Sequence, residues 1–124
     1  MITAKELMEA LPSKVKVAGT VFKIKRVSSG EEGLDEDADG MTLFDRHMIV
    51  IDHGLTLQRT FNAVYHEIQH CVNSEFDIDD GVDEENVAKN SANGWTSVFI
   101  DNPRLVTWFR KVSTFLRKEW KSKI

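Results

Sequence analysis

The chain has 124 residues, of which 41% are hydrophobic and 29% charged, with a formal net charge of −4. This length suits one domain with a modest core, and no apolar run is long enough to span a bilayer. Met1–Glu6 lacks the features of a signal peptide, and the single cysteine excludes an intrachain disulfide, so we expect one cytoplasmic domain over residues 1–124.

The N-terminal half predicts one short helix followed by a small sheet. Residues 2–11 have the apolar spacing of an amphipathic helix, which Pro12 would end. Strands or hairpins are expected where β-branched and apolar residues gather, at residues 15–24, 41–44 and 47–51. Residues 28–40 are polar and acidic and contain three glycines, which predicts an exposed loop.

The C-terminal half predicts three helices, over residues 56–73, 83–100 and from 103 to about 120. Apolar residues form one stripe along the first of them, at Leu57, Phe61, Val64, Tyr65, Ile68 and Val72. The pair Asn102-Pro103 predicts the start of the last helix, with Asn as N-cap and Pro in the first helical position. We therefore expect an α+β fold, in which a small, mostly antiparallel sheet packs on the first of these helices and two C-terminal helices follow.

The sequence His66-Glu67-Ile68-Gln69-His70 lies inside the first of these helices and indicates a specific chemistry. Residues four apart lie one turn apart on the same side of a helix, so His66 and His70 can bind one Zn²⁺ between them. Both lie nearly opposite the apolar stripe, which argues against core histidines. Glu67 stands beside them, where it can take a proton from a bound water. The pattern predicts a zinc hydrolase rather than three unrelated polar residues on a helix surface.

A catalytic zinc ion usually has three protein ligands, so the motif needs one more. No histidine follows it, which leaves His47 or His53 from the strand region, or a carboxylate from the next helix. Glu84 and Glu85 both lie in the first turn of that helix. We favour Glu85, because alanines follow it three and seven residues later and would let this helix approach the motif helix closely. Glu84 lies nearer the centre of the apolar stripe, which also fits an inward-facing ligand. Acidic residues are also favoured at helix N-termini without any ligand role.

The motif, followed by Glu85-Asn86-Val87-Ala88, resembles the glutamate-type zincins. It is most similar to the small metallopeptidase-like domains of the ImmA/IrrE sort and to short zincin-like proteins of bacteriophages, over about residues 41–103. The resemblance implies a zincin-like fold, with metal ligands at His66, His70 and Glu85 and a general base at Glu67. It also implies that residues 47–51 form an edge strand along which an extended substrate binds.

By this resemblance the chain would be a zinc-dependent peptidase that hydrolyses a protein or peptide substrate in the cytoplasm. Two alternatives remain open. One is a zincin-like binding module, of bacteriophage origin for instance, that holds the metal and engages a protein partner without cleaving it. The other is a nucleic-acid-associated regulator that uses the basic residues of the last helix, although a solvated helix face explains those residues more simply.

Two further patterns predict no site. Residues 35–40 match the opening of an EF-hand loop, but Arg46 stands at the twelfth position, where a bidentate glutamate is required. Cys71 follows His70 in the motif helix, yet it lies at the edge of the apolar stripe. This position favours a buried, inert thiol over a ligand or a nucleophile.

Overall fold

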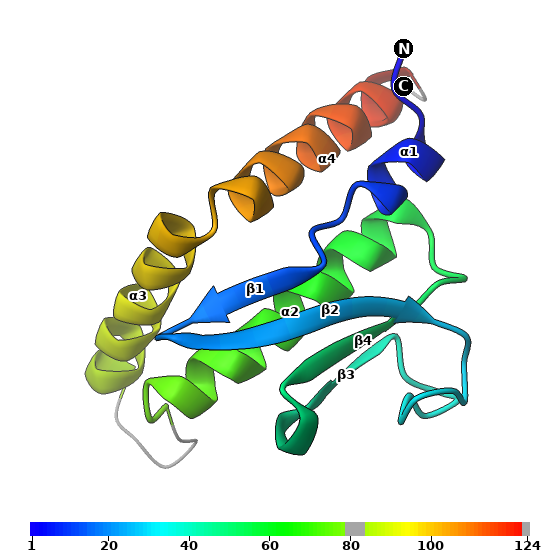
Figure 1. Cartoon of the computed structure of the whole chain (residues 1–124). Helices are drawn as coiled ribbons and strands as arrows, with labels where there is room; N and C mark the ends of the chain where they lie inside the picture. Colours follow the sequence, from blue (N-terminus) through cyan, green and yellow to red (C-terminus); the bar gives the residue numbers. More distant parts are fainter. Residues whose placement is uncertain (79–83, 123–124) are drawn as a thin grey trace.

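The computed structural model describes residues 1–78 and 84–122, and within them it has the α+β architecture that the sequence predicts (Figure 1). The elements in chain order are α1 (Ala4–Glu9), β1 (Lys14–Val17), β2 (Thr20–Val27), β3 (Gly40–Leu43), the short 3₁₀ helix η1 (Phe44–Arg46), β4 (Met48–Asp52), α2 (Leu57–Glu75), α3 (Glu84–Asp101) and α4 (Pro103–Ser122). The four helices in the described residues include none that is long and apolar enough to cross a membrane.

The four strands form one sheet in the order β1-β2-β4-β3, which is mostly antiparallel as predicted. β1 and β2 form a hairpin whose turn residues, Ala18 and Gly19, both have positive φ, as tight hairpin turns require. β2 and β4 are parallel, while β3 is antiparallel to β4. The expectation that residues 47–51 form an edge strand is wrong, because β4 hydrogen-bonds to a strand on each side. The edge position belongs to β3.

The loop between β2 and β3 is only partly exposed. It has no helix or strand, as predicted, but Leu34 is 2% exposed. Leu34 packs with Val27 and Val50 in a small second core on the sheet face opposite the helices. The loop therefore covers the β4–β3 half of that face.

The main core lies between the other face of the sheet and the helices. Thr56 caps α2 by accepting a hydrogen bond from the Arg59 backbone N–H, and α2 then lies along the sheet with Val64, Ile68 and Val72 fully buried. α3 and α4 meet at Asn102 and lie along the β1 side of the molecule (Figure 1).

Asn102 fastens the junction of α3 and α4 to β1. Its Oδ1 accepts a hydrogen bond from the Lys16 N–H at 2.8 Å, and its Nδ2 donates to the Lys16 carbonyl at 2.7 Å and to the Val98 carbonyl at 2.8 Å. α4 begins at Pro103, as predicted. The side chain of Asn102, however, contacts a strand rather than the first turn of α4, because β1 presents an unpaired backbone edge there.

Candidate metal centre

His66 and His70 face each other one turn apart on α2. Their Nε2 atoms lie 3.1 Å apart, their ring centroids are 4.8 Å apart, and both side chains are exposed. One carboxylate oxygen of Glu67 completes a group whose ligand atoms all lie within 4.8 Å of one another. The motif residues are thus brought together as their spacing predicts.

The spacing of the two imidazoles fits a shared divalent ion. Two nitrogens bound to one tetrahedral zinc ion at about 2.0–2.1 Å lie about 3.3–3.4 Å apart, close to the 3.1 Å between His66 and His70. Two imidazole nitrogens and a carboxylate also suit other divalent metals. This group can therefore hold a metal ion, and the donor atoms do not by themselves fix which one.

Glu67 is buried, with 5% of its surface exposed, because its side chain packs against the edge strand β3. The Thr42 hydroxyl lies 3.0 Å from Glu67 Oε1 and 3.3 Å from the Glu67 carbonyl, so it can donate a hydrogen bond to either oxygen. Gly40 makes this approach feasible: a Cβ there would lie 3.2 Å from Glu67 Cγ and 3.1 Å from the Val50 carbonyl oxygen. The carboxylate is thus held in one place by the neighbouring strand.

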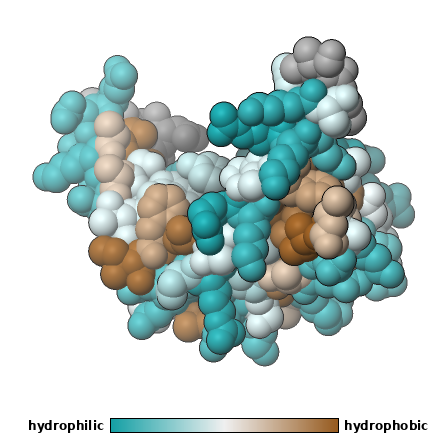
Figure 2. Space-filling model, turned by 90° about the horizontal axis from the view of Figure 1, so that it is seen from above, coloured by the Kyte–Doolittle hydropathy of each residue, from teal (hydrophilic) through white to brown (hydrophobic). Residues whose placement is uncertain are grey.

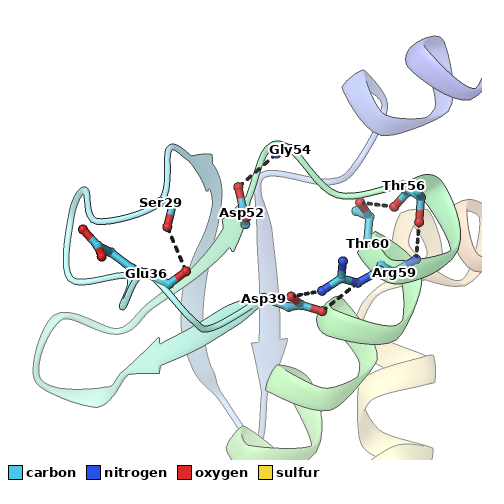
Figure 3. Close-up of polar contacts among 8 residues, drawn as sticks. All are labelled: Ser29, Glu36, Asp39, Asp52, Gly54, Thr56, Arg59 and Thr60. Atoms are coloured by element: carbon cyan, nitrogen blue, oxygen red, sulfur yellow. Dashed lines mark hydrogen bonds and ion pairs between the residues drawn. The ribbon is translucent and has the colours of Figure 1, made fainter.

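A second contact fixes β3 relative to the first turn of α2. Arg59 makes two hydrogen bonds to the Asp39 carboxylate, from Nη2 at 2.5 Å and from Nε at 3.2 Å (Figure 3). The Asp39 carbonyl accepts a bond from the Asp52 N–H at 2.8 Å, which ties the same residue to β4. Since Asp39 immediately precedes β3, these contacts set where Thr42 meets the motif.

Glu84 and Glu85 lie in the first turn of α3, and both are exposed. Neither belongs to the group formed by the motif residues, so the choice of Glu85 as third ligand stays a prediction. Glu85 was favoured because Ala88 and Ala92 were expected to pack on α2. The structure does not show this packing, since both alanines are exposed.

α3 instead approaches α2 one to two turns later. Gly94 lies against Val72, and the Trp95 ring stacks on Tyr65 with ring centroids 4.4 Å apart. The Trp95 Nε1–H donates to Gln69 Oε1 at 2.8 Å, one residue before His70. This face of the motif helix is thereby fastened to α3.

The two histidines of the strand region lie apart from the motif group in the described structure. His47 ends η1 in a left-handed conformation, and its ring centroid lies 5.5 Å from that of Phe22. His53 Nε2 is 2.8 Å from the Ser28 hydroxyl oxygen. Each ring already has a local partner.

Cys71 is buried, as its position on the helix predicts. Burial raises the pKa of the thiol to about 12, and the nearby Glu67 and Glu75 charges add to this increase. The thiol is therefore protonated at neutral pH, which makes it a poor metal ligand.

No family model, no curated protein and no solved structure matches the chain. The juxtaposition of His66, Glu67 and His70 is therefore the main basis for inferring a function.

Proposed function

We propose that the chain is a zinc-dependent peptidase of the zincin type. The observation that carries the proposal is the 3.1 Å separation of the His66 and His70 Nε2 atoms, with a Glu67 carboxylate oxygen within 4.8 Å of both. These two histidines would hold the ion together with Glu85. Glu84, His47 and His53 are the alternatives for the third position.

The chemistry follows from the charges at this centre. When bound, Zn²⁺ supplies a Lewis acid that lowers the pKa of a coordinated water toward neutrality. Glu67 would accept the proton of that water and deliver it to the leaving amine. Burial and the Thr42 hydroxyl hold the carboxylate of Glu67 in place, so little reorganisation is needed when the proton moves.

The edge strand β3 supports a peptide as the substrate. Its outer edge has no partner strand among the described residues, and it lies directly beside Glu67 through Thr42. An extended peptide that pairs with this edge would lie along the motif helix, with main-chain hydrogen bonds supplying affinity. This role, first expected of residues 47–51, moves to residues 40–43.

Metal analysis of the purified protein tests the first step. We expect about one equivalent of zinc in the wild type and in Glu67→Gln, and a loss of metal in His66→Ala. Glu85→Gln, Glu84→Gln, His47→Ala and His53→Ala identify the third ligand by the same measurement. Less than half an equivalent in the wild type at neutral pH would refute a metal centre.

Cleavage of a peptide library, read by mass spectrometry, tests the second step. Glu67→Gln should abolish cleavage while metal content stays unchanged, because the ligands remain and the base is lost. Glu75→Gln makes the same chemical change on the same helix and should keep activity. A biological activity that survives Glu67→Gln but not His66→Ala would establish a metal-dependent binding module instead.

A further inference from the structure

α4 carries a groove where it meets α1, on the β1 side of the molecule, and Figure 2 views the molecule from above α4. Two hollows of about 540 and 670 Å³ lie along the helix, the first between α1 and the start of α4 and the second further toward its end. Both are lined in part by Ile2 and Lys111, so the two hollows adjoin, and we call the pair the α4 groove.

The floor of the α4 groove is apolar, and a hydrogen bond fixes it beneath the first hollow. Leu7 and Trp108 are almost fully buried in the first hollow, and half-buried Phe115 lines the second. The Trp108 Nε1–H donates a 2.8 Å hydrogen bond to the Leu7 carbonyl, which joins α1 to α4 beneath the groove. In the first hollow a ligand would therefore meet a preformed surface, which lowers the entropic cost of binding.

The rim of the groove is basic although the whole chain is acidic. Four cationic side chains line it, namely Arg104, Arg110, Lys111 and Lys118, against a single acidic one, Glu119. The ion pairs in the part of the chain that the structure describes, Lys25–Glu32 and Arg59–Asp39, include none of these four cations. Figure 2 shows hydrophilic side chains crossing the middle of this face, with hydrophobic patches on either side.

We infer that the α4 groove binds an acidic segment of a partner protein, whose apolar side chains enter the two hollows while its carboxylates meet the cationic rim. α4 has 20 residues, which corresponds to about 30 Å and suits an amphipathic helix of similar length. Nucleic acid fits less well, because the apolar floor offers a phosphate backbone no partner and the Trp108 ring, only 3% exposed, cannot stack on a base. The groove shares no residue with the motif group, so this inference is independent of the metal centre.

The probe is a fluorescein-labelled 20-residue peptide of leucine and glutamate, with leucines at the i, i+3, i+4 and i+7 spacing. Fluorescence anisotropy should show saturable binding to the full chain. Replacing all glutamates by glutamine, or all leucines by serine, should weaken binding at least tenfold. Equal binding of the glutamine peptide would overturn the charge argument.

Arg104→Glu with Lys111→Glu should also weaken binding of the leucine–glutamate peptide at least tenfold. The matched control, Lys16→Glu with Lys23→Glu, makes the same charge change at exposed positions of β1 and β2 that line neither hollow, and it should leave affinity within twofold. Ala10→Trp, which partly fills the first hollow without altering charge, should weaken binding as well. Tighter binding of a 20-bp DNA duplex or of anionic phospholipid vesicles, or no saturable peptide binding, would overturn the inference.

Discussion

Substitution of Gly94 by alanine tests how closely α3 packs on the motif helix. A Cβ at this position would lie 2.4 Å from Val72 Cγ1 and 3.1 Å from Phe76 Cδ2. Carbon atoms in contact are normally about 3.5–4.0 Å apart, so the two helices would have to separate by about 1 Å. Val72 cannot turn away, because it is fully buried and its branched side chain has one strongly preferred rotamer in a helix.

The magnitude follows from two opposing effects. Overpacking of this kind costs about 1–3 kcal/mol. Because Val72 is buried and cannot move aside, we expect a cost near the upper end of this range. Alanine recovers about 1 kcal/mol through its better helix propensity. We therefore expect Gly94→Ala to lower the free energy of unfolding by about 1–2 kcal/mol, which corresponds to a decrease in Tm of about 4–8 °C for a chain of this length.

Urea unfolding followed by tryptophan fluorescence measures this change. Asn93→Ala introduces the same residue at the neighbouring exposed position and should not destabilise the protein. In a Val72→Ala background the penalty of Gly94→Ala should shrink, because the 2.4 Å clash with the Val72 methyl is gone and only the 3.1 Å approach to Phe76 remains. Wild-type stability of Gly94→Ala, or an unchanged penalty in that background, would refute the close packing of the two helices.

Three further outcomes follow from the structure. Thr42→Val removes the hydrogen bond to the buried Glu67 carboxylate, so unfolding by urea should show a loss of about 1–3 kcal/mol, with metal content unchanged and cleavage slower. Asn102→Ala should cost about 1–2 kcal/mol and accelerate hydrogen exchange of the Lys16 amide, measured by NMR. The Cys71 thiol has a pKa near 9.0 in the unfolded chain and near 12 when buried, so above pH 9 the unfolded chain loses this proton first. The free energy of unfolding should therefore fall as pH rises from about 9 to about 12. Urea titrations of Cys71→Ala should lack this contribution. A pH profile that is identical in wild type and Cys71→Ala would contradict this account of burial.

The elements that depend on local sequence were predictable. The apolar stripe of α2 and its Thr56 cap define a helix whose observed bounds, Leu57–Glu75, lie within two residues of the predicted ones. Asn102-Pro103 likewise marks the start of α4, because Pro has no backbone N–H to lose at a first helical position.

Non-local pairing could not be predicted in the same way. Strand order places β3 outside β4 through the parallel pairing of β2 with β4, and no local pattern encodes it. For the same reason, nothing in the local sequence predicts that Thr42 contacts Glu67, which lies 25 residues away. A glycine inside a strand is a known sign of close backbone approach, and Gly40 at the start of β3 is the one feature that could have pointed there.

The side-chain amide of Asn102 makes the hydrogen bonds to β1 that a neighbouring strand would otherwise make. It satisfies both backbone groups of Lys16, so intermolecular sheet extension from β1 is obstructed at that residue. The opposite edge strand, β3 (residues 40–43), has no side chain in this role among the described residues. Addition of a strand to this sheet would therefore be favoured at β3, and under the proposed function that edge would place an extended peptide beside Glu67.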